Sequence, residues 1–349
     1  MMRARYASYR LDFNFLAQTS RESMRHKDTY FLCLAPDGDD DFSRAGWGEA
    51  GLFRGLSAED GPDFLPTLHA LCHAINHGEP LPDITSFSSL RMAMESARAD
   101  MESGGRHEPF TSARLNIPIN GLIWIDTFDA TIHAIERKAR QFEVIKIKVG
   151  RLSVDEEGEI LRYIRRINPS AIIRLDANGA FHSLDEAMER IEGYARHRIH
   201  SIEQPVPQRR YELMSEVIRM SPIPVALDEE LIGINSPAEK RDLLEALRPA
   251  YIILKPTLCG GFSGSKEWIT AAGTTGAGWW FTSALESNVG LNAIARFTAS
   301  LPGPKMCQGL GTGQIYSNNI PSPLDMQGQC LISRPDVGWQ LPALDWIIP

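Results

Sequence analysis

The sequence predicts an α/β fold, a modified TIM barrel of the (β/α)8 type that carries an N-terminal α+β capping domain. Two observations support this fold class. Eight short apolar segments alternate with amphipathic helical patterns from about residue 114 to 314, as in parallel β/α units. Polar residues end several of these segments at a nearly constant spacing. An open, doubly wound sheet has the same alternation, so the sequence leaves that alternative open.

Residues 1–113 have a different pattern and are predicted to form the capping domain. Hydrophobic alternation and a glycine-rich stretch indicate three strands, at 9–15, 30–34 and 46–51. Apolar residues at helical spacing predict two helices, at 63–76 and 87–102. The tail, 315–349, is rich in turn formers but ends in apolar residues, so we expect it to pack back on the capping domain.

The barrel domain, 114–314, contains the alternating segments. The expected strands are 117–125, 144–149, 171–177, 199–203, 224–228, 251–255, 278–284 and 305–310. Ser153 and Ser183 each precede acidic residues at the start of a helical pattern. A serine cap followed by acidic residues is typical of a helix N-terminus, so we expect a helix to begin after each serine.

Composition excludes several classes of protein. The net charge is −8 and there is no basic block, which argues against a nucleic-acid partner. No apolar run approaches the roughly 18 residues of a membrane span, and the N-terminus lacks the apolar core of a signal peptide. The five cysteines are scattered, without a CxxC pair, as expected for a reducing compartment. We expect a cytoplasmic protein that acts on a small molecule.

Chemically active residues stand at the ends of consecutive predicted strands. They are Lys148, Asp176, Glu203, Asp228, Lys255 and Ser283, with Asn178, Glu229 and Glu286 close behind. Members of the first set are 25 to 28 residues apart, which is one β/α unit each time. Because the carboxyl ends of barrel strands meet at one rim, this spacing predicts one site that contains two lysines and three carboxylates.

Three converging carboxylates need a cation. Asp176, Glu203 and Asp228 offer only oxygen ligands, which favours a hard divalent ion, Mg²⁺ or else Mn²⁺, over zinc. A lysine on either side of such an ion suits removal of a proton next to a substrate carboxylate. Each motif has a plainer interpretation alone: a turn after Asp176, a strand ending before Pro205, a solvated acidic cluster at Asp228. Their common repeat length favours the active site.

Lys146 and Lys148 stand two residues apart in a β-branched run, so a strand would present both on one face. A neighbouring like charge favours the neutral amine that a general base needs. The competing interpretation is an edge strand protected by lysines. By strand parity, Asn178 and Ser283 are predicted to face the site, with Ser283 on the same face as Phe281.

Two further residues are predicted to support the site. Arg174 shares a face with Asp176 and is expected to pair with, or neutralise, the buried acids. Glu229 is expected to brace Lys255 from behind.

These motifs carry a resemblance. In order, they are Lys146-Ile147-Lys148, Asp176-Ala177-Asn178, Glu203-Gln204-Pro205, Asp228-Glu229 and Lys255-Pro256-Thr257. This order resembles the signature of the enolase superfamily in its muconate-lactonizing subgroup, whose sites use a Lys or His base with Mg²⁺. Within that subgroup, Arg174 and the stretches 283–291 and 309–314 resemble the o-succinylbenzoate synthases of menaquinone biosynthesis.

The resemblance implies a reaction. Lys148 would remove the proton α to the carboxylate of a hydroxylated, succinyl-bearing cyclohexadiene and return it to the departing hydroxyl in a syn elimination of water. Lys255 would stabilise the anionic intermediate from the opposite face. Mg²⁺ would lie on the three carboxylates. Arg54 and Arg21, in the capping loops, are candidates for the succinyl carboxylate, and the competing interpretation for either is a solvated surface arginine.

Three alternatives remain open at this stage. Racemases of N-acylamino acids and epimerases of dipeptides share the same lysines and metal ligands. A Schiff-base aldolase would use Lys255 but would not need three carboxylates. A catalytically inactive barrel that serves as a binding module would be expected to have lost at least one of the five residues, and all five are present.

Overall fold

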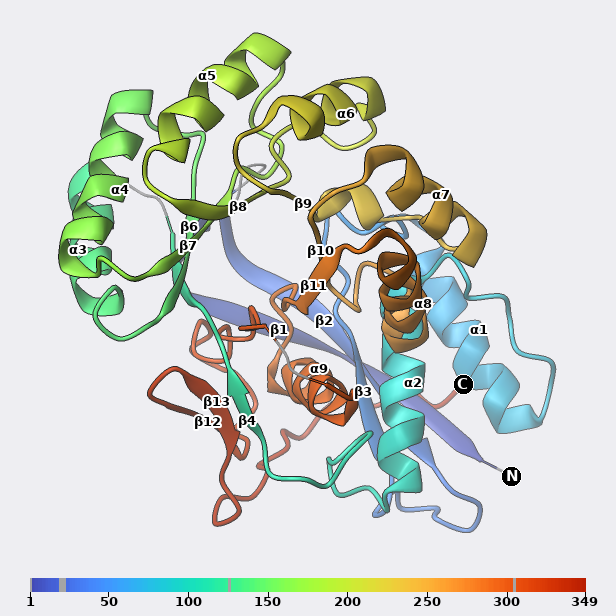
Figure 1. Ribbon diagram of the computed structural model, residues 1–349. Coiled ribbons are helices and arrows are strands. Elements are labelled where there is room, and N and C mark those ends of the chain that lie inside the picture. The colour runs from blue at the N-terminus through green and yellow to red at the C-terminus, as the bar shows by residue number, and fades with distance from the viewer. Residues whose placement is uncertain (1, 19–22, 125–126, 304–305) are drawn as a thin grey trace.

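The barrel domain is built on a parallel sheet whose strands follow one another in chain order, β11-β10-β9-β8-β7-β6-β5 (Figure 1). The strands are β5 (Gly121–Ile123), β6 (Val144–Lys148), β7 (Ile172–Asp176), β8 (Ile199–Glu203), β9 (Val225–Leu227), β10 (Tyr251–Leu254) and β11 (Gly278–Phe281). This computed structural model describes residues 2–18, 23–124, 127–303 and 306–349. A doubly wound sheet reverses its strand order at a switch point, so the sequential order rules that alternative out.

A short extended segment closes the barrel. Gln308 forms a parallel bridge with Ile119, just before β5, and Gly309 forms one with Thr282, just after β11. This segment therefore lies between the first and last strands and takes the place of the eighth. The predicted barrel is confirmed, and Lys305, the first residue of the predicted eighth strand, lies outside the described residues.

Helices follow the strands and cover the outside of the barrel (Figure 1). They are α3 (Phe128–Lys138), α4 (Val154–Ile167), α5 (Leu184–Ala195), α6 (Tyr211–Met220), α7 (Pro237–Leu247), α8 (Gly261–Thr275) and α9 (Asn288–Ser300), with a 3-10 turn at Glu229–Leu231. Both predicted serine caps are confirmed: Ser153 Oγ accepts from the Glu156 amide and Ser183 Oγ from the Glu186 amide. Leucine, isoleucine and valine side chains fill the layer between sheet and helices.

The capping domain has an antiparallel sheet in the order β1-β2-β3 and two helices. The elements are β1 (Arg3–Gln18), β2 (Ser23–Ala35), β3 (Gly46–Ala50), α1 (Phe64–His77) and α2 (Ser88–Glu102). β1 and β2 run further than predicted, because the added residues 3–8 and 23–29 are mostly charged or small, even though Ala4, Tyr6 and Ala7 are buried. Gly46 and Gly48 let α2 approach β3, since a Cβ at either would lie 2.0 or 1.9 Å from a carbonyl oxygen of α2.

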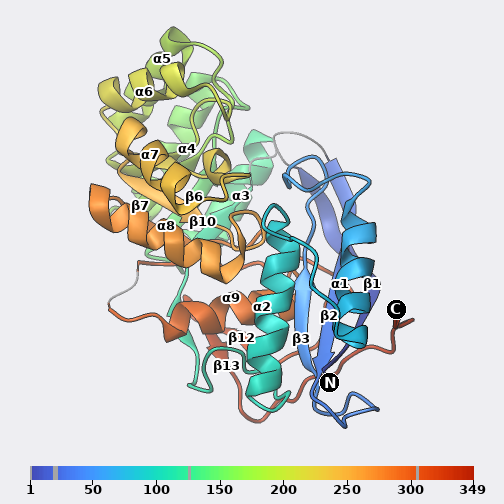
Figure 2. The same cartoon turned by 90° about the vertical axis from the view of Figure 1, so that its right-hand side faces the viewer.

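The capping domain rests on the barrel through α2. Figure 2 shows α2 beside α8 and β3. The Glu95 carboxylate of α2 accepts hydrogen bonds from the amides of Phe262 (2.6 Å) and Ser263 (3.1 Å) in the first turn of α8. An acidic side chain at a helix N-terminus is favourable, so this contact fixes the two domains together.

The predicted strand 117–125 is two strands. β4 (Asn116–Pro118) joins a separate antiparallel sheet with β12 (Leu324–Gln327) and β13 (Cys330–Ser333), whereas β5 belongs to the barrel. Residue 125 lies outside the described residues. The sequence did not reveal this change of sheet because 117–123 is apolar throughout except at Asn120.

The end of the chain returns to the capping domain. Tyr6 of β1 forms an antiparallel bridge with Ile347. The Trp346 ring meets the Trp47 ring edge-on at 5.1 Å. The domain boundaries at 113/114 and 314/315 stay predictions. Across the described residues, no helix has both the length and the apolar character to cross a membrane.

Candidate active site

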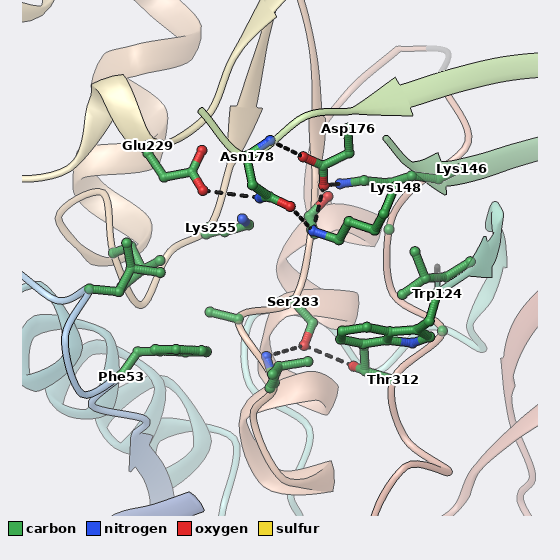
Figure 3. Close-up of a pocket in the computed structure, with 18 of the residues that line it drawn as sticks. Phe53, Trp124, Lys146, Lys148, Asp176, Asn178, Glu229, Lys255, Ser283 and Thr312 are labelled. Carbon is green, nitrogen blue, oxygen red and sulfur yellow. Dashed lines mark hydrogen bonds and ion pairs between the residues drawn. The ribbon is translucent and has the colours of Figure 1, made fainter. Parts of the chain in front are cut away.

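A cavity of about 220 Å³ opens at the rim formed by the carboxyl ends of the barrel strands. Both domains line it. The capping domain contributes Phe53, Arg54, Gly55 and Leu56, and the barrel contributes the predicted residues Lys146, Lys148, Asp176, Asn178, Glu229, Lys255 and Ser283. Figure 3 shows the lysines and acids on one side of this space and Phe53 on another. Most predicted site residues therefore line one cavity.

Lys146 and Lys148 leave β6 on one face, while Ile145 and Ile147 are fully buried on the other, as predicted. Lys146 Nζ lies 2.8 Å from both Glu203 oxygens and 2.8 Å from Asp176 Oδ2. Burial opposes the charged form of Lys146, but the neighbouring acids outweigh burial and raise its pKa. Lys146 is therefore a buried ammonium ion.

Lys148 stands one step nearer the rim. It pairs in register with Asp176, and its Nζ lies 2.9 Å from Asp176 Oδ2. It also donates to Asn178 Oδ1. Its side chain is 21% exposed, against 7% for Lys146. Both lysines line the cavity, but Lys148 is the more exposed one and lies nearer a ligand at the rim.

The three carboxylates lie on consecutive strands and are at most 3% exposed. Asp176 and Glu203 are register partners, and Asp228 follows β9 directly. Burial opposes ionisation of Asp176, but Lys146, Lys148 and Lys255 outweigh it and lower its pKa far below the usual range. Burial, together with the charges of Asp176 and Asp228, raises the pKa of Glu203. Negative charge at Glu203 is thus incompletely compensated by the protein.

This donor set fits a hard divalent cation. All three ligands are carboxylates, and the raised pKa of Glu203 is the response of a buried acid that needs more positive charge. Among the described residues, no three Asp, Glu, His or Cys side chains are clustered closely enough to form a ready-made metal site. Instead Lys146 bridges Asp176 and Glu203, and Lys255 Nζ contacts Asp228 Oδ2.

Lys255 follows the end of β10, on the other side of the acids from Lys148. Burial opposes its charge, but Asp228 and then Glu229 outweigh it and raise its pKa. Glu229 is thus one of the acids that raise the pKa of Lys255, and its role in bracing Lys255 stays a prediction. Glu229 Oε1 also accepts from Asn178 Nδ2 at 3.1 Å, so Asn178 connects the surroundings of Lys255 to Lys148.

Among the residues that the structure describes, Arg174 forms no ion pair with the buried acids, so that prediction is wrong. Its Nη1 donates to the Cys307 carbonyl at 2.8 Å, and its guanidinium lies 3.9 Å from the centre of the Trp280 ring. Burial lowers its pKa to about 10. Arg174 faces the barrel interior, as strand parity requires, but it stands two residues deeper than Asp176 and packs below the acids.

Ser283 lines the cavity for a different reason than predicted. Phe281 contacts Phe297 of α9, so the odd residues of β11 face the helices. β11 ends at Phe281, and the following turn brings Ser283 to the cavity. Its hydroxyl donates to Glu286 Oε2 (2.7 Å) and accepts from the Leu285 amide and Thr312 Oγ1. Ser283 therefore has no free hydrogen to donate to a ligand.

Glu286 belongs to a buried polar network between the two domains. It accepts hydrogen bonds from Ser283 Oγ, the Ala284 amide and Thr257 Oγ1. Its neighbour Ser287 donates to Glu49 of β3 through both its amide (2.9 Å) and its hydroxyl (2.5 Å). Sequence reasoning missed Glu49, because 238 residues separate it from Ser287.

Replacement of Glu286 by alanine is expected to lower the free energy of unfolding by about 3 kcal/mol, because three buried donors would lose their acceptor. Urea denaturation of both proteins measures the difference. Glu192→Ala, at an exposed glutamate of α5, is the matched control and should change stability by less than about 0.5 kcal/mol. Equal effects of the two substitutions would contradict a stabilising role for this network.

Comparison with known proteins agrees with this geometry. A family model described as Enolase C-terminal domain-like matches residues 130–338. An o-succinylbenzoate synthase from Desulfotalea psychrophila is 40% identical over 368 aligned positions, which cover 93% of this chain and 98% of the relative.

Solved structures resemble the whole chain. The crystal structure of MenC from Desulfotalea psychrophila matches with a TM-score of 0.81 and 37% identity, covering 95% of this chain and 99% of that one. The structure of an L-Ala-D/L-Glu epimerase from Bacillus subtilis also matches with a TM-score of 0.81, covering 98% of this chain and 99% of that one. Because the two sequences are only 20% identical, this match shows a shared fold and nothing further. Given the family model and the 40% identical relative, the chain belongs to the enolase superfamily and, within it, to the o-succinylbenzoate synthase family.

Proposed function

We propose that this protein is a hydro-lyase that converts 2-succinyl-6-hydroxy-2,4-cyclohexadiene-1-carboxylate to 2-succinylbenzoate by syn elimination of water, in menaquinone biosynthesis. The observation that carries the proposal is that Lys148 and Lys255 line one cavity together with Asp176, and that the buried carboxylates Asp176, Glu203 and Asp228 end the three strands between those of the two lysines. Membership of the o-succinylbenzoate synthase family supports the choice of reaction.

Lys148 is the proposed proton carrier. As a base, its amine takes the proton from the ring carbon that bears the carboxylate, and the electron pair of that bond moves toward the carboxylate. The resulting ammonium then gives the same proton to the neighbouring hydroxyl. The carbon–oxygen bond breaks, water leaves, and the ring becomes aromatic. One group can serve both steps because the two positions are on the same face in a syn elimination.

The other charged residues are proposed to stabilise the anion. Lys255, held as ammonium by Asp228 and Glu229, is proposed to approach the ring from the face opposite Lys148. Bound Mg²⁺, or Mn²⁺, would be held by Asp176, Glu203 and Asp228 and would stabilise negative charge on the substrate carboxylate. Lys146 fixes the orientation of Glu203 through contacts to both carboxylate oxygens.

We also propose that the protein works in the cytoplasm on this small carboxylate, without a nucleic-acid partner. The five cysteines support a reducing compartment, because each is a free thiol in the structure.

The direct test is incubation of the purified protein with Mg²⁺ and the cyclohexadiene substrate, with loss of the diene absorbance as the measurement. We expect turnover. Absence of turnover, together with exchange of the α-proton of N-succinylamino acids, would favour a racemase of acylated amino acids instead.

Arg54 is proposed to bind the far carboxylate of the succinyl chain. It lines the cavity from the capping domain and pairs with Asp60 at 2.6 Å. Arg54→Met is expected to raise KM about tenfold to a hundredfold with little change in kcat, because a charge-assisted contact made before and during the reaction is lost. Steady-state kinetics measure both constants. Arg21, the other candidate, lies outside the described residues.

Arg10→Met is the matched control for this substitution. Arg10 is also an exposed arginine paired with an aspartate, Asp28 at 2.9 Å, but it does not line the cavity. We expect its KM to stay within about twofold of the unmodified protein. A similar rise in KM for both variants would show that Arg54 matters only through the overall charge of the protein, and that it does not contact the substrate carboxylate.

A further inference from the structure

Two polar side chains on the uncharged wall of the cavity lack hydrogen-bond partners. Asn120 precedes β5 and is 4% exposed, and its Oδ1 has no partner in the described structure. Thr282 follows β11, and its buried Oγ1 is likewise unpaired there. Both residues line the cavity. Buried polar atoms are normally hydrogen-bonded, so two orphans in one cavity call for a partner that the protein does not supply.

The two residues flank the segment that closes the barrel. The Asn120 amide donates to the Gln308 carbonyl at 2.9 Å, and Thr282 forms its bridge with Gly309. A Cβ at position 309 would lie only 2.4 Å from Thr282 Oγ1. Glycine is therefore required beside the hydroxyl. The short segment holds Asn120 and Thr282 on its two sides.

The chemistry of this wall selects an uncharged ligand atom. Its other members are Leu122, Trp124, Gly309 and Gly311. The charged residues that line the cavity come instead from the ends of β6, β7 and β10, from Glu229 and from Arg54. A substrate carboxylate would bind beside these charged residues, where lysines and an arginine are available, and not at the uncharged wall. A neutral oxygen suits this wall. The unpaired Asn120 Oδ1 can only accept a hydrogen bond, so its partner must be a ligand hydroxyl, whereas the Thr282 hydroxyl can donate to either kind of oxygen.

We propose that Asn120 and Thr282 form a subsite that hydrogen-bonds a neutral oxygen of the substrate. This inference rests on the proposed function. The substrate has two such oxygens near its reacting carbon, the ring hydroxyl that departs and the succinyl ketone. Both are attached at the ring positions that neighbour the carboxylate-bearing carbon. The ring hydroxyl can pair with both unpaired atoms, because it can donate to Asn120 Oδ1 and accept from Thr282 Oγ1, whereas the ketone can accept only from Thr282 or from the Asn120 amide nitrogen. The pair orients the ring for Lys148 by binding one of these oxygens.

The experiment uses nearly isosteric substitutions, Asn120→Leu and Thr282→Val, in the full chain with Mg²⁺. Steady-state kinetics and calorimetric binding of the product, 2-succinylbenzoate, are measured for each. The product keeps the ketone but has lost the ring hydroxyl. We expect kcat/KM to fall about tenfold in each variant, the size expected for one lost hydrogen bond.

Product binding distinguishes the two oxygens. Weaker product binding by about tenfold would assign the subsite to the ketone, whereas unchanged product binding with lowered kcat/KM would assign it to the departing hydroxyl. Thr282→Ser keeps the hydroxyl and should recover part of the activity lost in Thr282→Val. Thermal unfolding of each variant shows whether it folds.

Ser88→Ala is the matched control, because Ser88 Oγ is also buried and unpaired in the described structure but lies in α2 and does not line the cavity. We expect its kinetic constants to be unchanged. Unchanged kinetics and product binding in both pocket variants, with normal turnover by the unmodified protein, would overturn the subsite alone. No turnover and no product binding by the unmodified protein would overturn the proposed function and this inference together.

Discussion

Replacement of Lys148 by alanine is expected to lower kcat by about 10⁴-fold, the upper range for loss of a general acid or base, because one side chain is proposed to carry the proton in both steps. The fold should survive. Lys148 stands at the rim with a partly exposed side chain, and Asp176 keeps its second ion pair, with Lys146 at 2.8 Å. The measurement is diene turnover, with circular dichroism and urea denaturation to check the fold.

Lys266→Ala provides the comparison, since Lys266 is an exposed lysine of α8 that does not line the cavity. It should retain kcat within about twofold. Residual turnover of more than a few per cent in Lys148→Ala would show that another group carries the proton. Lys255→Met would then be the next variant, because Lys255 also reaches the cavity.

The charged part of the site could be predicted from the sequence because strand ends in a parallel barrel share one rim. The spacing of Asp176, Glu203 and Asp228 by one β/α unit is a local property of the chain, and the barrel converts it into proximity. The register of the strands then places Lys148 beside Asp176 and Asp176 beside Glu203. The spacing along the chain was therefore enough to predict that these residues lie close together.

Other contacts depend on where strands end and on which distant segments meet. Strand parity placed Ser283 correctly in the cavity for a wrong reason, because β11 ends at Phe281, three residues before the end of the predicted strand 278–284. Arg174 has the expected face, but side-chain packing against Trp280 decides its partner. Asn120 is one polar residue in an apolar run, and its cavity position depends on the closing bridge between Ile119 and Gln308. No local pattern contains this information.

If Asp176, Glu203 and Asp228 hold a divalent ion, removing that ion should lower kcat about as much as Lys148→Ala does. Removal of divalent ions by a chelator should abolish turnover, and Mg²⁺ or Mn²⁺ should restore it. Binding should also stabilise the fold, because an ion that binds only the folded protein adds about 2.7 kcal/mol at a hundred times its Kd. Thermal unfolding with and without Mg²⁺ gives this second measurement, which does not depend on the identity of the substrate.

Glu203→Gln tests one of the three carboxylates that are proposed to hold the ion. Glu203 is 2% exposed, and its pKa is raised by burial and by its acidic neighbours. An amide at this position cannot supply the charge that a divalent ion requires, so both turnover and the Mg²⁺-dependent rise in unfolding temperature should be lost. The variant should still fold, because glutamine preserves the shape of the side chain and an oxygen for Lys146.

Glu230→Gln separates a metal ligand from a merely buried glutamate. Glu230 is fully buried in the same domain, but its carboxylate accepts from the uncharged donors Gln204 Nε2 (3.1 Å) and the Arg209 amide (2.8 Å), whereas Glu203 contacts Lys146. This variant should be less stable overall and yet keep its Mg²⁺-dependent rise in unfolding temperature. If Glu203→Gln kept that rise as well, Glu203 would not be a metal ligand, and the positive charge near it would come from Lys146 and Lys255.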